Sequence, residues 1–295
     1  MPPSSWSSPT RASLPHSWAD RVGVSAFVSR IERFASVPST QPIVRWWLDE
    51  GTPEVAIAVA DEQTEGRGRL GRTWTAPPGA ALLLSAGYRP LELAAGHAWR
   101  LAATASLAML DAAEDVAGLR DGTLGLKWPN DIVADGPDGL LRKVAGVLGE
   151  AVLEGDVVTS AVVGTGVNAD WAAHDFPAEL ASSMTSLREL SGGRPIDRDA
   201  LLDAWLLRLE PRYEALRAGR FDAAGWSTRQ RTTGHSVEVD GPGGRIVADA
   251  VGVDPESGAL LTHGSDGTIR PIDSGDVTRC RVVNLPGLSL GSSRT

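Results

Sequence analysis

The sequence is short of cysteine and of long apolar runs. Its 295 residues include one cysteine, Cys280, which excludes an internal disulfide framework and a thiolate metal cluster and fits a reducing compartment. Its longest apolar runs, such as AALLLSAG, are far shorter than the roughly 20 residues that a membrane-spanning helix needs. The Pro- and Ser-rich N-terminal stretch lacks the apolar segment of a signal peptide. We therefore expect a cytoplasmic protein with no membrane partner.

Basic charge is scarce as well. The formal net charge is -9, which argues against a protein that coats nucleic acid, because such proteins carry broad basic faces. Of the 28 basic residues only Lys127 and Lys143 are lysines. A codon bias toward arginine explains most of this imbalance. The closeness of the two lysines either is chance or indicates sites where a guanidinium cannot replace an ammonium.

Apolar patterning predicts a larger α+β domain followed by a small β-barrel. Strands are expected at 29–37, 54–63 and 81–89 and in LGLKW, DIVAD, KVAGVLGEAV and VTSAVVGTGVNAD, with helices at 94–117 and 197–218. Short Val- and Ile-rich strands from about 230 to 284 predict the barrel. The expected divisions are a flexible tail at 1–28, the larger domain at 29–228, the barrel at 229–285 and a second flexible tail at 286–295.

A further helix is expected in STQPIVRWWLDEG. Ser39, Thr40 or Gln41 can cap it, Pro42 suits its first position, and Gly51 can end it. Because this helix and its neighbours do not alternate strictly with the strands, the larger domain is assigned to the α+β class.

The stretch EGRGRLGRTW, at 65–74, runs against the acidic composition. Its glycines let backbone N–H groups turn toward a ligand, and Arg67, Arg69 and Arg72 offer bidentate donors to phosphate or carboxylate. It is not a Walker A loop, since no Gly-Lys-Ser/Thr follows, and RTWTAPPG replaces the helix that a dinucleotide fingerprint requires. By itself it is either an anion-binding loop or a mobile surface loop. The acidic background disfavours an RNA-binding segment.

Three later segments place polar residues or glycines beside strands: LKWPND, RKVAGVLGE and VVGTGVNAD. Gly146 and Gly149 lie inside a strand, which indicates close approach of a ligand or of another backbone. Each segment alone also fits sheet packing, and Lys127 and Asp131 also fit an ordinary surface pair. Together the segments bring glycine gaps, lysines and arginines to adjacent strands of one sheet.

In their order along the chain, GRGRLGRTW, KWPND, KVAGVLGE and GTGVN resemble the catalytic domain of biotin–protein ligases. The resemblance covers roughly residues 30–285. It implies a class II synthetase-like domain with a mixed central sheet flanked by helices, followed by a small SH3-like β-barrel. It also implies ATP-dependent attachment of biotin, through biotinyl-5′-AMP, to a lysine of the biotin carboxyl carrier domain of acyl-CoA carboxylases. The alternative is a lipoate or octanoate ligase or transferase of the same fold.

The resemblance also implies a set of site residues. Biotin contacts are expected from Ser39, Thr40, Gln41, Gln63, Arg67, Gly68, Arg69, Lys143 and Gly146, with Gly149 giving room to the tail. ATP or adenylate contacts are expected from Arg67, Arg69, Arg72, Trp74, Asn130, Asp131 and Asn168. The catalytic residues are expected to be Lys143, Arg69 and Asp131. The departure from the family is Gln41, where Asn is usual.

The chemistry explains why these residue types are needed. Biotin's carboxylate must approach the α-phosphate of ATP, and two unit charges about 4 Å apart repel by about 4 kcal/mol at an effective dielectric of about 20. Fixed cations must therefore concentrate there, and Mg²⁺ is expected to be held mainly by the phosphates, with no firmly assigned protein ligand. The acceptor lysine arrives protonated, so Asp131 is expected to orient and deprotonate it. Trp74 either stacks on adenine or anchors the core.

Only 38 residues precede Ser39, and they include the Pro- and Ser-rich tail and the first strand. This predicts a monofunctional ligase without an N-terminal DNA-binding domain and without a DNA partner. The stretch between Asp131 and Lys143 looks longer than is usual in the family that the sequence resembles, which implies an extended hairpin there.

Overall fold

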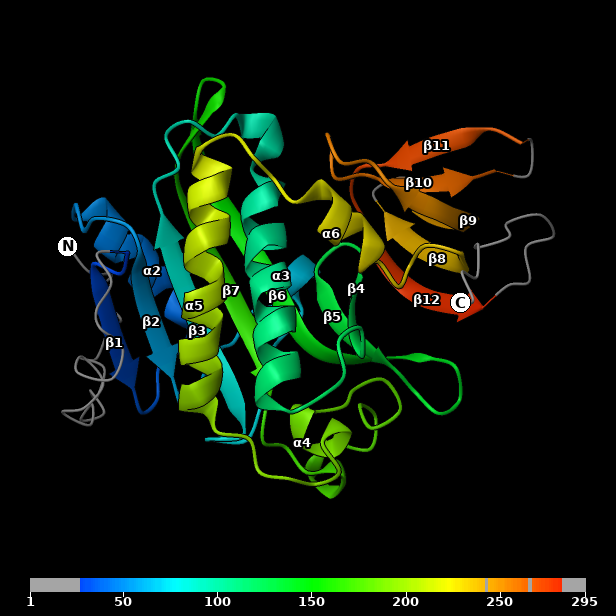
Figure 1. Cartoon of the computed structure of the whole chain (residues 1–295), viewed down its shortest axis with the longest axis horizontal. Helices are drawn as coiled ribbons and strands as arrows, with labels where there is room; N and C mark the ends of the chain where they lie inside the picture. Colours follow the sequence, from blue (N-terminus) through cyan, green and yellow to red (C-terminus); the bar gives the residue numbers. More distant parts are fainter. Residues whose placement is uncertain (1–26, 242–243, 265–266, 283–295) are drawn as a thin grey trace, which may run out of the picture.

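Two β-sheets organise the chain, a seven-stranded sheet flanked by helices and a five-stranded sheet toward the C-terminus (Figure 1). The structure is a computed structural model, and it describes residues 27–241, 244–264 and 267–282. The arrangement confirms the predicted α+β class. The tails expected at 1–28 and 286–295 lie almost entirely outside the described residues and stay predictions.

The larger sheet is mixed. Its strands are β1 (Arg30–Phe34), β2 (Ala56–Ala60), β3 (Ala81–Tyr88), β4 (Leu124–Lys127), β5 (Asp131–Asp135), β6 (Leu141–Glu154) and β7 (Val157–Asn168). They lie in the order β1-β2-β3-β7-β6-β5-β4, with β1 and β2 parallel and the other neighbours antiparallel. All eight residues of β3 are buried, because both faces of this part of the sheet are covered, and an apolar run such as ALLLSAGY suits such a strand.

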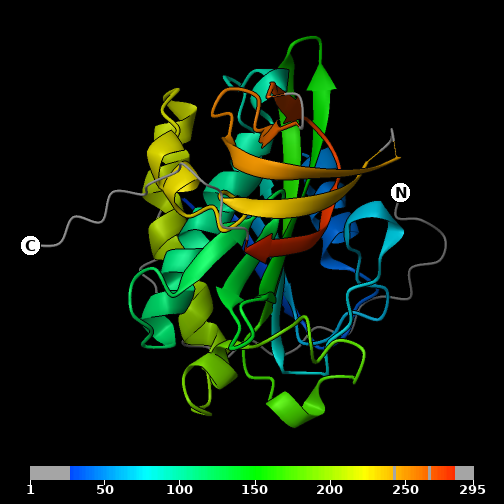
Figure 2. The same ribbon diagram turned by 90° about the vertical axis from the view of Figure 1, so that its right-hand side faces the viewer.

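Helices cover the two faces of the sheet. The long helices α3 (Trp99–Val116) and α5 (Arg198–Arg217) pack on one face, and α2 (Thr40–Asp49) lies on the other (Figure 2). The buried residues of α2 include Ile43, Val44, Trp47 and Leu48, which pair at the i,i+4 spacing that makes one apolar stripe. Two short helices, α4 (Leu187–Leu190) and α6 (Ala223–Thr228), lie in the later connections. Among the described residues, no helix is both long and apolar enough to cross a membrane.

Two helix boundaries differ from the predictions. The segment expected to be helical over 94–117 begins with a 3-10 turn at Ala95–His97, and α3 starts only at Trp99, with no side-chain cap bond to mark its start. Pro42 is the third residue of α2 rather than the first. That position is tolerated because the first N–H groups of a helix have no partner within it.

The smaller sheet contains β8 (His235–Gly241), β9 (Gly244–Val253), β10 (Leu260–His263), β11 (Ile269–Ile272) and β12 (Asp276–Val282). Its strands are all antiparallel, in the order β11-β10-β9-β8-β12. In the described residues the edge strands β11 and β12 are not paired with each other. The expected barrel is therefore an open five-stranded sheet here.

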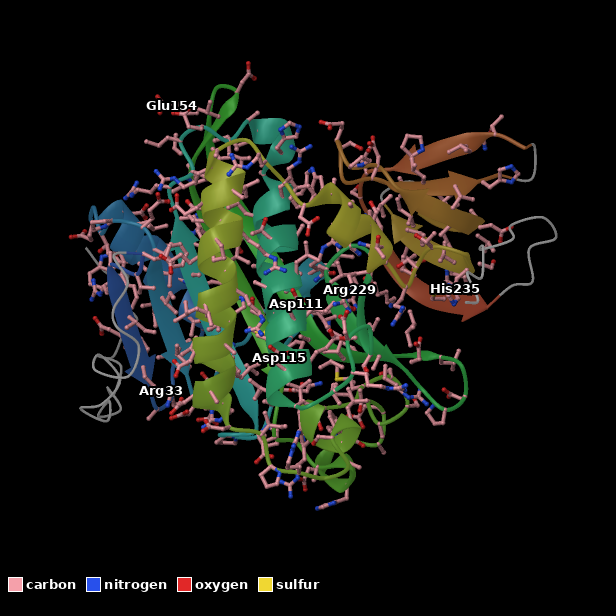
Figure 3. All side chains as sticks on the ribbon, viewed as in Figure 1. Arg33, Asp111, Asp115, Glu154, Arg229 and His235 are labelled. Atoms are coloured by element: carbon pink, nitrogen blue, oxygen red, sulfur yellow. The ribbon has the colours of Figure 1, made fainter. Side chains whose placement is uncertain are left out.

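Ion pairs tie the connection between α6 and the smaller sheet to α3, and Arg100 on α3 also pairs with Glu256, between β9 and β10, at 3.0 Å. Arg229, which follows α6, pairs with Asp111 and Glu114 on α3, and Figure 3 labels Asp111 and Arg229 at this junction. On the same side, the Trp128 indole N–H donates to the carbonyl of Gly258 at 2.9 Å. The smaller sheet is thus attached beside β4 and β5, where the KWPND segment lies. The expected domain boundary stays a prediction.

Candidate active site

One pocket of about 430 Å³ gathers every residue that the sequence predicts for the site except Gly149. It lies on the α2 side of the larger sheet and is lined by β6 and β7, the start of α2, the loop 65–74 and the start of β12. The predicted residues that line it are Ser39, Thr40, Gln41, Gln63, Arg67, Gly68, Arg69, Arg72, Trp74, Asn130, Asp131, Lys143, Gly146 and Asn168. The structure brings them together, and their individual roles stay predictions.

The floor of the pocket is bare backbone on β6 and β7. Gly146 and Gly166 are register partners, and the Trp74 ring lies against both. A β-carbon at Gly166 would approach Trp74 Cε2 to 2.7 Å, and one at Gly146 would approach Trp74 Cζ3 to 3.2 Å. Any side chain larger than hydrogen would therefore displace Trp74. The Lys143 ammonium lies 5.2 Å from the centre of the same ring, within range of a cation–π contact.

Gly149 does not belong to this floor. A β-carbon there would meet the side chain of Ala102 on α3 at 3.4 Å, on the opposite side of the sheet. The prediction that Gly149 gives room to the biotin tail is wrong, because it lies three residues from Gly146 and successive strand residues alternate between faces. Gly164 on β7 lies on the pocket side instead, where a β-carbon would meet the Gln41 side chain at 3.1 Å.

A hydrogen-bonded cluster at the start of α2 forms the neutral polar end of the pocket. Gln63 Oε1 accepts from the Thr40 backbone N–H at 2.8 Å and from the Thr40 hydroxyl at 3.1 Å. The Thr40 hydroxyl also lies 2.7 Å from that of the fully buried Ser85. Because the Gln63 carbonyl is engaged, its amide N–H groups are the ones left for a ligand.

Two neighbouring side chains complete this end. Ser39 is the N-cap residue of α2, but its hydroxyl makes no cap hydrogen bond, which leaves that group for another partner. Gln41 donates to the carbonyl of Leu148 at 3.1 Å and is mostly buried. The longer amide therefore reaches across the sheet from α2 to β6 and walls the pocket beside Gly164.

The pocket also contains a paired lysine and carboxylate. Lys143 Nζ lies 2.7 Å from Asp131 Oδ1, so the partner of Asp131 is Lys143 and not Lys127, the alternative that spacing allows. The Lys143 backbone is fixed on both sides, since its N–H donates to Ser183 and its carbonyl accepts from Thr185. This pairing places an ammonium and a potential proton acceptor side by side.

Two asparagines hold the surrounding backbone. Asn130 Nδ2 donates to the carbonyl of Val147 at 3.0 Å, and Asn168 Nδ2 donates to that of Thr185 at 3.0 Å. Asn168 is fully buried, and its Oδ1 has no hydrogen-bond partner in the described residues. That oxygen is available to a hydroxyl or a hydrated cation at the pocket wall.

The loop 65–74 folds back on itself over the pocket. The Trp74 N–H donates to Gly66, and the Gly68 N–H donates to Arg72 at 2.7 Å. A β-carbon at Gly66 would lie only 2.3 Å from the Trp74 carbonyl oxygen, so the closure requires glycine. At the loop's start the Glu65 N–H donates to the Pro38 carbonyl, which ties the loop to the residue before Ser39.

The pocket is cationic although the protein is acidic. Five basic residues and two carboxylates line it, and each carboxylate already pairs with one cation, Asp131 with Lys143 and Asp276 with Arg72. Within the described residues no ion pair engages the remaining cations, Arg67, Arg69 and Lys127.

Arg69 gives the clearest indication of an anion-binding site. Its Nη1 is buried with no hydrogen-bond partner in the part of the chain that the structure describes. Burial lowers the pKa of its guanidinium, Asp276 and Asp131 oppose that shift, and Arg72 adds to it. A desolvated cation with an unused donor indicates a site for a negatively charged ligand.

Sequence reasoning assigned no site role to several lining residues, although Lys127, Gly164 and Gly166 lie in segments that it singled out. These residues are Leu84, Ser85, Lys127, Leu148, Gly164, Thr165, Gly166, Leu180, Ser183, Met184, Asp276, Val277 and Thr278, together with Thr73, Thr75 and Val147. Ser85 had a usable signal, a hydroxyl inside the apolar run ALLLSAGY. Asp276 had no usable signal in the sequence, because only the three-dimensional arrangement of the two sheets brings it to the pocket.

No group of three or more His, Cys, Asp or Glu side chains in the described residues could hold a metal ion. The oxygen donors at the pocket wall include the Asp131 carboxylate and Asn168 Oδ1. This sparse set fits a hard cation that keeps phosphates and water as most of its ligands.

Comparison with known proteins identifies the family of the chain. Residues 34–168 match the model of the biotin/lipoate A/B protein ligase family. The chain is 32% identical to the bifunctional ligase/repressor BirA of Bacillus spizizenii over 82% of this chain and 71% of the relative. It is 34% identical to the biotin–[acetyl-CoA-carboxylase] ligase of Mycobacterium tuberculosis, over 76% of this chain and 79% of the relative.

A solved structure is similar over most of its length. The biotin protein ligase of Aquifex aeolicus, in complex with biotin and ATP, superposes with a TM-score of 0.69 at 29% identity, covering 83% of this chain and 96% of that one. The family match, the two relatives and this fold agree with one another. The chain therefore belongs to the biotin/lipoate A/B protein ligase family, within its biotin protein ligases.

Proposed function

We propose that the protein uses ATP to attach biotin to a lysine of a biotin carboxyl carrier domain, through biotinyl-5′-AMP. The observation that carries the proposal is a single pocket with a neutral hydrogen-bonding end and a cationic end. The neutral ureido ring of biotin needs hydrogen-bonding groups, and the approach of the biotin carboxylate to the triphosphate of ATP needs cations. The names of the relatives support the same activity, since one is a biotin–[acetyl-CoA-carboxylase] ligase and the Aquifex enzyme binds biotin and ATP.

The neutral end suits the head of biotin. The free hydroxyl of Ser39, the amide N–H groups of Gln63 and the wall formed by Gln41 present hydrogen-bonding groups in a fixed arrangement. The glycine floor at Gly146 and Gly166 lets the ring and tail lie close to the sheet. Few, well-placed polar groups within an otherwise apolar slot are typical of small-molecule sites.

The cationic end suits adenylate formation. In this step a carboxylate oxygen of biotin bonds to the α-phosphorus of ATP, and pyrophosphate leaves with the electron pair. Lys143 would neutralise the carboxylate and the α-phosphate oxygens, and Arg69 would offer its unused donor to phosphate. The position of Lys143 beside Asp131, and the Nη1 of Arg69 that is unpartnered within the described residues, support these roles. Arg67 adds charge at the loop. Preorganised cations of this kind stabilise charge that develops in the transition state.

The second step transfers the biotinyl group. The acceptor lysine arrives as an ammonium and must lose one proton before its nitrogen can attack the anhydride carbonyl; AMP then leaves with the electron pair of the C–O bond, and a second proton is lost as the amide forms. Asp131 lies beside Lys143 in the pocket, so its carboxylate can orient the incoming ammonium and accept the first proton. We propose that Trp74 covers the intermediate, because its ring already lies on the floor next to Lys143.

We also propose a metal ion, a protein partner and a location for the reaction. Mg²⁺ would reduce the charge of the phosphates, with Asn168 Oδ1 and Asp131 as the oxygen donors in reach of the pocket. The protein partner would be the carrier domain of an acyl-CoA carboxylase. A cytoplasmic location and the lack of a DNA-binding role remain parts of the proposal.

The test is incubation of the full chain with biotin, ATP, Mg²⁺ and a carrier domain, followed by intact mass. The expected result is a carrier heavier by one biotinyl group, with no change when ATP is omitted. The matched incubation with lipoate or octanoate decides between the two activities of this fold. Modification of the carrier by lipoate or octanoate, and not by biotin, would overturn the proposal.

A further inference from the structure

The pocket rim contains a residue of the smaller sheet that faces the cationic loop. Asp276, the first residue of β12, forms an ion pair through Oδ2 with Arg72 Nη2, although the two residues lie 204 positions apart. Val277 and Thr278 continue the same part of the lining. The smaller sheet therefore supplies part of the pocket wall, in addition to packing beside it.

The two members of this pair differ in how firmly they are held. The Asp276 side chain is only 13% exposed, whereas that of Arg72 is 59% exposed. The backbone before Asp276 packs closely on β8, since a β-carbon at Gly275 would lie 2.7 Å from Val239 Cγ1 and 3.1 Å from the Asp240 carbonyl oxygen. Asp276 is thus the fixed member, and the loop is the part that it holds.

Asp276 also acts on the neighbouring arginine. Burial lowers the pKa of the Arg69 guanidinium, and Asp276 is the largest influence that raises it again. The other carboxylate at the pocket, Asp131, is engaged by Lys143 at 2.7 Å. Asp276 is therefore the carboxylate available to the arginines of the loop.

We propose that Asp276 is a positioning residue for the ATP-dependent half of the reaction, because its ion pair with Arg72 holds the loop 65–74 over the pocket with Arg69 directed inward. This inference rests on the proposed function. A loop that is already closed loses less conformational freedom when ATP binds, so the ion pair strengthens ATP binding. Arg72 has five N–H donors, so it can keep this carboxylate while it also approaches a phosphate.

The test compares Asp276→Asn with the wild-type full chain in biotin-dependent exchange of pyrophosphate into ATP. We expect KM for ATP to rise about threefold to fivefold, the size that a partly exposed ion pair supports, with kcat and KM for biotin little changed. Asp276→Glu, which keeps the charge, is expected to recover most of the loss. A purely structural role would instead move all three constants together.

A matched control lies on the neighbouring strand. Asp240 is the register partner of Asp276 on β8, but its carboxylate pairs with Arg245 of the same sheet. Asp240→Asn removes a comparable charge without touching the loop, so its KM for ATP is expected to match the wild-type value.

Trypsin digestion tests, without any substrate, whether the ion pair between Asp276 and Arg72 holds the loop. Cleavage after the loop arginines in the ligand-free chain is expected to be faster in Asp276→Asn than in wild type or in Asp240→Asn. An unchanged or lowered KM for ATP in Asp276→Asn would overturn the inference. Absence of biotin-dependent exchange in the wild type would instead overturn the proposed function, and the digestion would still show whether Asp276 holds the loop.

Discussion

The floor and the roof of the pocket are built in different ways. The floor consists of paired strands, with Gly146 and Gly166 in register and Trp74 lying directly on them. The roof is a single loop closed by a few backbone hydrogen bonds and one ion pair to the smaller sheet. We infer from this difference that the floor sets which acid fits, whereas the roof sets how firmly the anionic half of the ligand is held. Four substitutions test this division, from the largest expected effect to the smallest.

Lys143 lies between the floor and the roof of the pocket, so we expect its loss to slow adenylate formation more than any other substitution. Lys143→Ala removes the ammonium from the point where two anions must meet and leaves Asp131 without its partner. Adenylate formation is expected to fall by about 100-fold or more, as for loss of one charge-stabilising group in an active site. The measurement is biotin-dependent pyrophosphate exchange, and a fully active variant would remove Lys143 from the mechanism.

A substitution in the floor of the pocket should weaken the binding of biotin. Gly166→Ala places a β-carbon 2.7 Å from Trp74 Cε2 and forces the ring upward into the pocket. KM for biotin is expected to rise about tenfold or more, which corresponds to about 1.4 kcal/mol of lost binding. Gly149→Ala is the control, since its β-carbon meets Ala102 at an ordinary 3.4 Å on the other face. Equal effects of the two substitutions would contradict the assignment of faces.

The hydrogen-bonded end should show a smaller effect. Ser85→Ala deletes the hydroxyl 2.7 Å from that of Thr40 and loosens the residue that fixes Gln63. The expected cost is about 1 kcal/mol, seen as a severalfold rise in KM for biotin. Ser106→Ala, which loses a bond to its own helix, should leave that constant unchanged. A wild-type KM in Ser85→Ala would show that Thr40 and Gln63 need no support from β3.

A substitution at Leu70, the apex of the loop that forms the roof, should have the smallest effect on stability and ATP binding. Leu70 is 71% exposed and has a φ of 55°, a left-handed conformation that asparagine adopts more easily than leucine. Leu70→Asn is expected to change the free energy of unfolding and the KM for ATP little, within about 0.5 kcal/mol. Thermal unfolding and steady-state kinetics measure the two quantities. A large rise in KM would mean that the apex itself contacts the ligand.

Much of the floor could be predicted from the sequence because its signals are local. Glycines inside a strand at Gly146, a start signal for α2 at Ser39 and an isolated cationic loop each have a physical meaning within a few residues. Their order along the chain then pointed to the family. The error at Gly149 came from treating two glycines of one strand as equivalent, when their odd spacing places them on opposite faces.

The roof could be predicted only in part. The arginines and glycines of the loop were visible as an anion-binding pattern, but its anchor, Asp276, lies on a strand of the other sheet with nothing unusual in its neighbourhood. The partner of Asp131 was likewise open, because Lys127 is its register partner on β4 while Lys143 lies on the neighbouring strand β6, opposite Val133, and only the side-chain geometry selects Lys143. Contacts between distant segments depend on how the two sheets pack, which local patterns do not encode.

The most direct measurement of the central claim is exchange of labelled pyrophosphate into ATP by the purified full chain, with biotin, with lipoate and without an acid. We predict exchange that requires biotin and that falls by about 100-fold or more in Lys143→Ala. Exchange that proceeds with lipoate but not with biotin would contradict the account, as would no exchange with either acid.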